Sequence, residues 1–459
     1  MFSRKEFVNS GFVHSVKVPR LYKTASLIVK RVVENGESLK QLVYSSRHKN
    51  VKGLYALVVE TIKHSQALDK LLKKSKLLEK ESRLEPWLAR ILITEMLYRN
   101  KELKGTSKPV QTIISYREKL MKFMDKNKND RSSAKVIKPR YVRVNTLQYT
   151  PDEVIKMFRD EGWIFLQSCS DYESFLETVT NLKDDEFMKD FHVKEMLVFP
   201  PSAQFYKNEL YLNGSIVLQD KASCLPVCLL QPTPNSTVLD MCSAPGMKTT
   251  HLSARMKNKG TIYAVELNQR RYETLCDLVK NTGCTNVKPI NMDALLIGQN
   301  DETSWSKDVE YILVDPSCSG TGMVDRRNVF LNEQKDNQRI KKLCAFQFKL
   351  LMHALTNFPN AKRVVYSTCS VLTVENEKVV DDVLRKLSQS DCPSEFELVD
   401  AMKESWPTRG SEDYEIGKHC LYADPEKDQT NGFFVAVFQR RESKGESEEP
   451  KKKKNRSNI

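Results

Sequence analysis

The segment Thr237-Val-Leu-Asp240-Met-Cys-Ser-Ala-Pro-Gly246-Met-Lys-Thr249 is the most informative part of the chain for its fold. It opens with the short apolar run of a buried strand, and a helical segment (251–256) follows the loop. Open parallel sheets bind ligands beyond the carboxyl ends of their strands. The loop matches neither the Gly-x-Gly-x-x-Gly pattern nor a P-loop, because Gly246 stands alone and Met247 separates it from Lys248. The sequence therefore predicts a nucleotide-like ligand without phosphates.

The chain from Ser215 onward alternates strands with helices. The predicted strands are Thr237–Asp240, Thr261–Val265, Val287–Ile290, Tyr311–Val314, Arg363–Ser367 and Gly432–Phe438, and the predicted helices His251–Met256, Arg271–Val279, Lys342–Phe358 and Asn376–Leu387. Such alternation indicates an α/β fold with a doubly wound, largely parallel sheet.

Acidic residues end two of these strands. Glu266 follows Gly246 by 20 residues, the offset at which an acid binds a ribose diol. Asp293 ends the next strand, within reach of an adenine amino group. A nucleoside that carries a carboxylate but no pyrophosphate is S-adenosylmethionine, which is the predicted cofactor. The alternative is that each acid is an ordinary residue at the end of a strand.

Two turns present cysteines after buried strands: Asp315-Pro-Ser-Cys318-Ser-Gly320 and Tyr366-Ser-Thr-Cys369-Ser370. A thiolate that adds to carbon 6 of cytosine makes carbon 5 nucleophilic enough to take a methyl group. A carboxyl group such as Asp315 can hydrogen-bond the ring nitrogen, and a base must then remove the carbon 5 proton. These residues leave open which thiol attacks. Free cysteines are also commonly buried and inert, which is how we interpret most of the others.

The cysteine count of eleven is odd, and no Cys-x-x-Cys pair occurs. Neither a zinc site nor a disulfide framework is indicated, so we predict no metal and free thiols in a reducing compartment. No run approaches the roughly 18 apolar residues of a membrane span. We therefore expect a soluble protein with no membrane partner.

The net charge of +14 is divided unevenly. Residues 1–150 hold 33 Lys and Arg against 13 Asp and Glu, whereas the remaining residues hold 40 against 46. A basic first part joined to a mildly acidic remainder favours a polyanionic partner, namely nucleic acid. The alternative is a solvated basic face that binds nothing.

Four segments are predicted: a basic helical N-terminal domain (1–136), a small α+β RNA-binding module (137–213), the catalytic domain (214–440) and a disordered basic tail (441–459). In the module, Tyr141, Arg143 and Asn145 alternate with valines as in a half-buried strand, and such side chains suit single-stranded RNA. A linker domain that binds nothing is the alternative. Residues 1–20 are basic like a mitochondrial presequence, but Glu6 and the lack of an amphipathic stripe argue against one.

The block from Arg140 to Phe438 resembles the Sun-domain (Fmu-type) RNA cytosine-5 methyltransferases, whose fold is the class I methyltransferase sheet. The matching motifs are Arg143-Val-Asn145, Gln219-Asp-Lys-Ala-Ser223, Ala244-Pro-Gly-Met-Lys-Thr249, Asp315-Pro-Ser-Cys318-Ser-Gly320, Tyr366-Ser-Thr-Cys369-Ser370, Glu375-Asn-Glu377 and Gly432-Phe-Phe-Val-Ala436. Two positions depart from the common pattern, because many members have Asp-x-Pro-Cys in the first cysteine turn and Gly at the place of Met247.

The resemblance implies roles that the residues alone do not give. Cys369 would be the attacking nucleophile, Cys318 would assist release of the adduct, and Asp315 would contact the target base beside the cofactor. The cofactor site would comprise Cys242, Ser243, Ala244, Pro245, Gly246, Met247, Lys248, Glu266, Arg271, Asp293 and Asp315.

Three segments look closest to the fifth branch of the eukaryotic NSUN group: Leu42–Ser46 with Leu54–Val58, Leu218–Pro226, and the first cysteine turn. The resemblance implies methylation of large-subunit ribosomal RNA by a monomer in the nucleus or nucleolus, with a mitochondrial location as the alternative. Two other functions stay open. One is the same chemistry on transfer RNA, and the other is a ribosome-assembly factor without catalysis.

Overall fold

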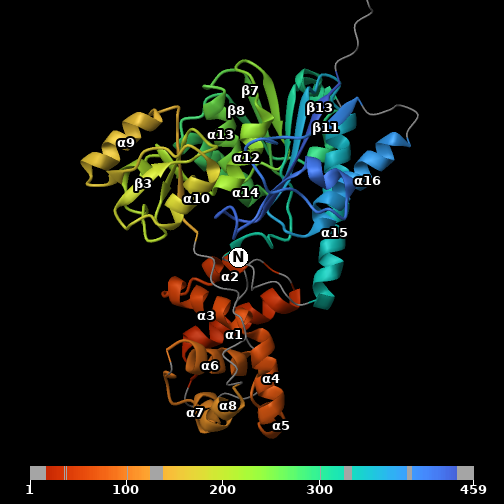
Figure 1. Ribbon diagram of the computed structural model, residues 1–459. Coiled ribbons are helices and arrows are strands. Elements are labelled where there is room, and N and C mark those ends of the chain that lie inside the picture. Colours follow the sequence, from red (N-terminus) through yellow and green to blue (C-terminus); the bar gives the residue numbers. More distant parts are fainter. Residues whose placement is uncertain are drawn as a thin grey trace, which may run out of the picture. The chain divides into compact units, whose positions relative to one another are not determined.

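The computed structural model describes residues 17–35, 37, 39–100, 102–124, 138–299, 301–324, 333–389 and 395–441. The predicted disordered tail from residue 442 and residues 1–16 of the presequence interpretation lie outside these ranges. The chain separates into two compact units, the first made of residues 1–135 with 328–333 and the second of residues 136–327 with 334–459 (Figure 1). The boundaries of the four predicted segments remain a prediction.

The first unit is helical, as predicted. Its helices are α1 (Arg20–Asn35), α2 (Leu39–Ser45), α3 (Val51–Lys63), α4 (Ser65–Ser75), α5 (Leu77–Lys80), α6 (Pro86–Tyr98), α7 (Lys108–Ser115) and α8 (Arg117–Phe123). Leu54, Val58 and Ile62 recur at the spacing of helical turns, and they are buried in the core of this unit. Over the described ranges, no helix is long and apolar enough to cross a membrane.

The second unit begins with a five-stranded sheet. Its strands are β1 (Arg140–Val144), β2 (Ile164–Phe165), β3 (Glu186–Lys189), β4 (Met196–Phe199) and β5 (Ile216–Leu218), in the spatial order β2-β3-β4-β1-β5. Helices α9 (Pro151–Asp160), α10 (Tyr172–Thr180) and α11 (Glu209–Leu212) connect them. We call this part the small module. Strand β5 extends this sheet beyond residue 213, the predicted end of the module, into the predicted catalytic domain (214–440).

The prediction that β1 is half-buried is wrong. Tyr141, Arg143 and Asn145, expected on a solvent face, are 3%, 0% and 1% exposed. Arg143 donates from Nε to Gln219 Oε1 (2.7 Å) and from Nη2 to Thr250 Oγ1 (3.0 Å). The polar face of the strand is therefore covered by protein and satisfied by hydrogen bonds. Alternation along β1 marks two chemically different faces, and neither of them is free to bind RNA.

The larger sheet has the predicted doubly wound, mostly parallel form. Its strands are β6 (Thr237–Asp240), β7 (Thr261–Val265), β8 (Val287–Ile290), β9 (Tyr311–Val314), β10 (Arg363–Thr368), β11 (Phe396–Val399), β12 (Leu421–Ala423) and β13 (Phe433–Arg440). The order is β11-β13-β10-β9-β6-β7-β8, and β12 pairs with β13. The chain runs outward from β6 to β8 and resumes at β9 on the other side of β6. The switch point therefore lies between β6 and β9, where such sheets bind their ligands.

Two hydrophobic cores cover the faces of this sheet. Val238, Leu313 and Val365 belong to one core, with helices α12 (Lys221–Leu230) and α13 (Met247–Arg255). Their neighbours along the strands, such as Leu239 and Ile312, belong to the other, with α15 (Glu333–Thr356) and α16 (Glu377–Ser388). Both faces are apolar, which explains the continuous apolar runs of these strands. The first core also includes residues of the small module, so the two parts share it.

The predicted element bounds hold closely for the parallel strands and less well elsewhere. Strand β13 runs antiparallel to β10, β11 and β12, which strand patterns alone do not reveal. Helix α13 begins at Met247 rather than at 251, and α15 begins at Glu333 rather than at 342. Helix α12 was not predicted, and Pro226 within it interrupts the helical sequence pattern.

A buried lysine joins the small module to α12. Lys221 Nζ lies 2.8 Å from Asp190 Oδ2, and neither side chain is exposed. The ammonium group also lies over the rings of Tyr172, Phe175 and Trp406, at 4.9, 4.7 and 5.4 Å from their centroids. Such cation–π contacts stabilise a cation that has lost its water. The ion pair between Lys221 and Asp190 thus takes the place of the water that would otherwise solvate the two charged groups.

We expect Lys221→Met to destabilise the second unit by about 3–5 kcal/mol, because it leaves the Asp190 carboxylate buried without its cation. Urea unfolding would be followed by tryptophan fluorescence in a Trp87→Phe background. Of the four tryptophans, only Trp87 lies in the first unit, so the remaining signal reports on the second.

The matched control is the double variant Lys221→Met with Asp190→Asn. A neutral amide can still accept the backbone N–H groups of His192 and Val193 that Asp190 Oδ1 accepts, so most of the lost stability should return. A double variant as unstable as the single one would contradict this account of the pair.

Candidate active site

The two cysteine turns lie side by side because their strands are neighbours. Strands β9 and β10 are parallel, with Val314 opposite Tyr366, so both turns leave the same edge of the sheet. The Sγ atoms of Cys318 and Cys369 are 3.1 Å apart, and both residues are half-buried. The sequence-predicted pair is thus brought into direct contact. The cysteines that the structure describes are all free thiols.

The two thiols are not equivalent. The hydrogen bond to Cys369, together with burial, raises the pKa of Cys318 well above its usual range. Cys318 therefore resists loss of its proton, and either sulfur can be the donor of this hydrogen bond. The Lys248 ammonium interacts electrostatically with Cys369. Cys369 is thus the sulfur better placed to carry the negative charge of a nucleophile.

Asp315 is held from two sides. Lys248 Nζ lies 2.6 Å from its Oδ2, and the Ser367 hydroxyl donates to its Oδ1 at 2.7 Å. Burial alone would lower the pKa of Lys248, yet the Asp315 carboxylate raises it above its usual value. Both side chains stay partly accessible, at 12% for Lys248 and 24% for Asp315. The carboxylate is fixed in place and can still meet a ligand.

Glu375 and Asn376, which follow the second cysteine turn, hold both cysteine turns together. The carboxylate of Glu375 is buried and accepts from the backbone N–H of Ser319 (2.9 Å) and from Gln347 Nε2 (3.1 Å). The next residue, Asn376, accepts from the Thr368 hydroxyl and donates to the carbonyl of Ser370. The family motif contained Glu375 and Asn376, but no role was predicted for them. Their function in the structure is to fix the path of both turns.

A close approach of backbones completes the support. Gly322 donates from its N–H to the carbonyl of Cys369 (2.9 Å), and Gly432 donates to the carbonyl of Gly322 (2.8 Å). A Cβ atom on Gly322 would lie 2.0 Å from the carbonyl oxygen of Gly432. A Cβ atom on Gly432 would in turn lie 2.6 Å from Val371 and 2.9 Å from the Cα of Gly322, which gives a physical reason for the glycine in the matching motif.

The loop between β6 and α13 contains the predicted cofactor residues Cys242 to Lys248. Gly246 has φ +106° and is the N-cap of α13, with no side chain capping the helix. Its Cβ position would lie 3.0 Å from Leu275, so glycine is required by both backbone and packing. Ser243 ties the loop to β7 through the carbonyl of Val265. The uncapped N–H groups at the start of α13 can therefore meet a ligand with negative charge.

The remaining predicted cofactor residues lie at the same edge of the sheet. Glu266 follows β7, is 5% exposed, and pairs with Arg271 at 3.2 Å. Arg271 also donates from Nη2 to the carbonyl of Ala244, which lies in the cofactor loop. Asp293 follows β8 and accepts from the N–H of Leu295 at 3.0 Å. Lys248 joins this set to Asp315 and the thiols, a link that the sequence analysis did not predict.

Asp240, at the end of β6, is a buried acid beside the site. Burial raises its pKa to about 7, although the hydroxyl of Thr249 donates to its Oδ2 at 2.7 Å. Asp240 is 1% exposed, so it supports the loop through its hydrogen bond with Thr249 and does not face a ligand.

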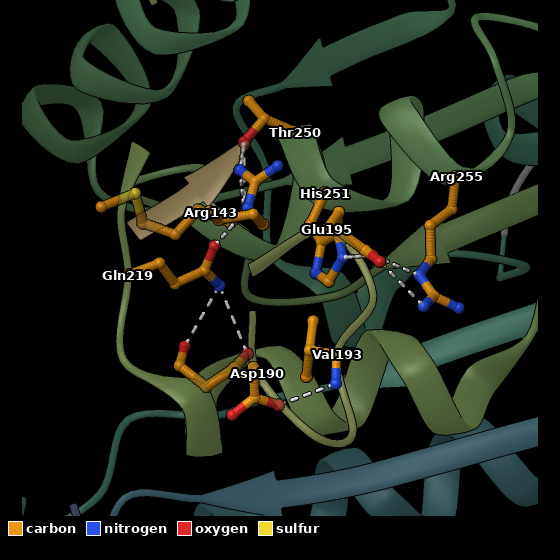
Figure 2. Close-up of polar contacts among 10 residues, drawn as sticks. Arg143, Asp190, Val193, Glu195, Gln219, Thr250, His251 and Arg255 are labelled. Carbon is orange, nitrogen blue, oxygen red and sulfur yellow. Dashed lines mark hydrogen bonds and ion pairs between the residues drawn. The ribbon is translucent and has the colours of Figure 1, made fainter. Parts of the chain in front are cut away.

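A second set of polar contacts joins α13 to the small module (Figure 2). Glu195 accepts from His251 Nε2 (2.5 Å) and from Arg255 Nε (2.8 Å). Although burial would raise the pKa of Glu195, these two partners lower it well below its usual range. Burial lowers the pKa of His251 to about 4, so His251 is neutral at pH 7 and Arg255 supplies the balancing charge.

The same place holds a group of possible metal ligands among the described residues, namely Glu195, Cys228 and His251, whose ligand atoms lie within 4.8 Å of one another. The Arg255 guanidinium already forms an ion pair with the Glu195 carboxylate. Burial raises the pKa of the Cys228 thiol to about 12, so the sulfur is protonated. A neutral thiol beside an arginine disfavours the binding of a metal cation. We therefore interpret the cluster of Glu195, Cys228 and His251 as structural.

Three family models match the chain. Residues 227–439 match the model of the 16S rRNA methyltransferase RsmB/F. Residues 138–219 match the ferredoxin-like domain of NOL1/NOP2/Sun domain family member 5, and residues 52–136 match the N-terminal domain of that member. The second match covers the small module, including β5.

Several curated proteins are similar over nearly their whole length. A 28S rRNA (cytosine-C(5))-methyltransferase of Drosophila melanogaster is 40% identical, over 93% of this chain and 98% of that protein. One of Mus musculus is 38% identical, over 92% and 91% respectively. The 25S rRNA (cytosine-C(5))-methyltransferase rcm1 of Schizosaccharomyces pombe is 34% identical, over 90% of each.

Solved structures share the fold. The crystal structure of PH0851 aligns with a TM-score of 0.64 at 22% identity, over 92% of this chain and 99% of that one. The crystal structure of NSun6 from Pyrococcus horikoshii with SFG aligns with a TM-score of 0.51 at 21% identity, over 67% and 93%. At these identities the likeness supports the class I methyltransferase fold alone.

Two buried histidines of the second unit, His251 at the junction in Figure 2 and His192 in the small module, make folding stability depend on pH. Burial holds the pKa values of His192 and His251 at about 4, whereas both ionise near 6.5 in the unfolded chain. As pH falls from about 6.5 to 4, the unfolded state takes up protons that the folded state does not. Stability should therefore fall in this window, by up to about 1.4 kcal/mol per pH unit for each histidine.

The His251→Gln variant tests this origin, because glutamine can still donate to Glu195 but does not titrate. Urea unfolding of the second unit, measured from pH 7 to pH 4.5, should depend less steeply on pH than in the parent protein. His48→Gln, in the first unit, is the control and should leave the slope unchanged. Equal slopes for parent and His251→Gln would rule out this histidine as the source.

Proposed function

The chain belongs to the NOL1/NOP2/Sun family of RNA (cytosine-5)-methyltransferases, and we propose that it methylates carbon 5 of a cytosine in large-subunit ribosomal RNA. The relatives named as 28S and 25S rRNA methyltransferases support this substrate, since they match over nine-tenths of the chain. The matches to both NSUN5 domain models support the same branch.

The observation that carries the proposed chemistry is the contact between two cysteine sulfurs beside a lysine–aspartate pair. The sulfurs lie 3.1 Å apart, and Lys248 lies 2.6 Å from Asp315. One sulfur can then act as the nucleophile, and the other can assist when that first sulfur leaves carbon 6 of the base. An acidic group lies beside them to meet the base. Each of these parts is needed for methylation of carbon 5 through a covalent adduct.

In the proposed mechanism Cys369 attacks carbon 6 of the cytosine as a thiolate. The bond that forms pushes electron density onto the ring, and carbon 5 becomes nucleophilic. Asp315 meets the polar edge of the base, where the Lys248 ammonium and the Ser367 hydroxyl hold it in position. S-adenosylmethionine, when bound, supplies the methyl group that carbon 5 takes.

Release requires that a water molecule accept the carbon 5 proton as the base and that the carbon 6–sulfur bond break. The electrons of the broken carbon–hydrogen bond restore the ring double bond as the Cys369 sulfur leaves as a thiolate. Cys318 lies against that sulfur and carries a proton, so we assign it to this second half. The hydrogen bond from Cys318 stabilises the departing thiolate.

The residues at the switch point fit the proposed cofactor. Uncapped N–H groups at the start of α13, the buried Glu266 carboxylate and Asp293 lie at one sheet edge. They suit a ligand with a carboxylate, a ribose diol and a base, and nothing there resembles a pyrophosphate cradle. We therefore propose that residues Cys242 to Lys248, Glu266, Arg271, Asp293 and Asp315 hold S-adenosylmethionine.

The remaining parts of the proposal concern substrate RNA and location. The excess of basic residues in 1–150 suits an RNA backbone, so we assign the N-terminal domain and the small module to RNA binding. A ribosomal substrate implies a role in ribosome biogenesis within the nucleolus. We further propose that the enzyme acts as a monomer.

The roles of the two cysteines can be separated by single variants. Cys369→Ala should abolish incorporation of labelled methyl groups into RNA, because no adduct can form. Cys318→Ala should let the adduct form and fail to release it, which gives a protein–RNA band that survives a denaturing gel. A band in Cys369→Ala but none in Cys318→Ala would reverse the assignment. Cys276→Ala, on α14 (Gln269–Asn281), is the control and should behave as the parent protein.

The substrate can be tested with purified protein and labelled cofactor. Large-subunit rRNA from cells that lack the enzyme should gain 5-methylcytosine at one position, whereas transfer RNA from the same cells should not. Methylation of transfer RNA alone would establish the alternative substrate. No methylation of either RNA, despite measurable cofactor binding, would favour an assembly factor without turnover.

A further inference from the structure

A hollow of about 360 Å³ lies in the small module, and neither Cys318, Cys369 nor the cofactor loop lines it. It is formed by the segment after β2, by helix α10 and by the turn from β3 to β4. Its lining includes Ser168, Cys169, Phe175, Lys189, Phe191 and Lys194. The volume is at the lower end of the range for small-ligand pockets, which suits one nucleotide.

The walls of the hollow combine an aromatic ring with two cations. Phe191 is 37% exposed, so part of its ring is accessible from the hollow that it lines. Its ring packs against Phe175 and Tyr172, with centroids 6.2 and 5.8 Å away, so it is held in place. Lys189 and Lys194 lie at the rim, where Lys189 also pairs with the exposed Asp152 at 2.6 Å. The hollow offers a stacking surface beside positive charge.

One acid also lines the hollow, and its charge is already balanced. Asp190 lies against Lys221 at 2.8 Å, with neither side chain exposed. Its other oxygen accepts the backbone N–H groups of His192 and Val193 at 2.8 Å. Asp190 therefore repels an anion only weakly, and the two rim lysines determine the sign of the potential at the opening.

We propose that this hollow binds one unstacked nucleotide of the substrate RNA, flanking the target cytosine, with the base on Phe191 and the phosphate at Lys189 and Lys194. Single-stranded RNA is recognised in this way, by bases that stack on aromatic rings while basic side chains follow the backbone. The inference rests on the proposed RNA substrate and adds a second contact point to it. Polar face residues of β1 cannot serve this purpose, because they are buried.

The hollow and the cysteine turns belong to one connected frame. Gln429 donates from Nε2 to the carbonyl of Leu176 on α10 at 2.8 Å. In the same loop, Asn431 accepts the N–H of Val324 at 3.2 Å, and Gly432 bonds to Gly322, which bonds to Cys369. An RNA strand anchored at the hollow would therefore be held in a fixed relation to the nucleophile. Such positioning lowers the cost of placing the target base.

Phe191→Ala and Lys194→Gln test the inference in the full-length enzyme, with large-subunit RNA from cells that lack the enzyme as substrate. We expect Phe191→Ala to raise KM for RNA roughly 5- to 150-fold, which is the loss of one stacked base, with little change in kcat. Lys194→Gln should make binding less dependent on salt, by about 0.7 in the slope of log K against log salt. The affinity for S-adenosylmethionine should stay unchanged in both.

The matched controls are Tyr206→Ala and Lys156→Gln, which remove an exposed aromatic ring (59% exposed) and an exposed lysine elsewhere on the small module. They should leave KM unchanged. If Phe191→Ala behaves like Tyr206→Ala, or if all four variants weaken RNA binding equally, the hollow is not a nucleotide site. A parent enzyme inactive on every RNA would instead count against the proposed function itself.

Cys169 supplies a readout that does not depend on turnover. This half-buried thiol lines the hollow, so bound RNA should slow its alkylation by a small maleimide, as measured by peptide mass spectrometry. Half-buried Cys276, on α14, is the internal reference. Protection of Cys169 by the substrate RNA, lost in Phe191→Ala, would support the site. Equal alkylation with and without RNA would overturn the inference.

Discussion

The parallel pairing of β9 with β10 is the constraint on which the site depends. It sets Val314 opposite Tyr366, so Asp315 and Ser367 leave the sheet together and can share a hydrogen bond. A shift of one residue would turn every side chain on one strand to the other face. Asp315 would then point away from Ser367, and the two turns could not bring their sulfurs into contact. The catalytic geometry is therefore a consequence of strand register, which the apolar side chains on both faces enforce.

The sequence predicts this part of the molecule well because each strand is a short apolar run with polar residues at its end. Strands β6, β7, β8 and β9 have the predicted bounds, and the cysteines and acids stand where such strands end. Other elements lack a local signal. Strands β11 and β12 exist as partners of β13. The link from Lys248 to Asp315 spans 67 residues, so no local pattern predicts it.

The small module shows where reasoning from alternation fails. Arg143 was expected to face solvent, because charged residues are seldom fully buried without partners. Its partners, Gln219 and Thr250, come from distant segments, and they replace water on the guanidinium. The same holds for Glu195 with His251 and Arg255 (Figure 2). Buried charges contribute little net stability, yet they tolerate few alternative arrangements. These contacts accordingly fix how the module docks on the catalytic sheet.

Helix α13 contacts three parts of the site: the loop before it, Asp315 and the small module. Side chains on a helix project about 100° apart per residue, so consecutive positions of α13 reach different surroundings. Lys248 points to Asp315, Thr250 meets Arg143 of the small module, and His251 and Arg255, one turn apart, both meet Glu195. The helix begins at the loop assigned to the cofactor. A movement of α13 would thus disturb the loop proposed to bind the cofactor, Asp315 and the small module together. This fixed geometry suits the proposed reaction, in which carbon 5 must face the methyl donor while the Cys369 sulfur holds carbon 6.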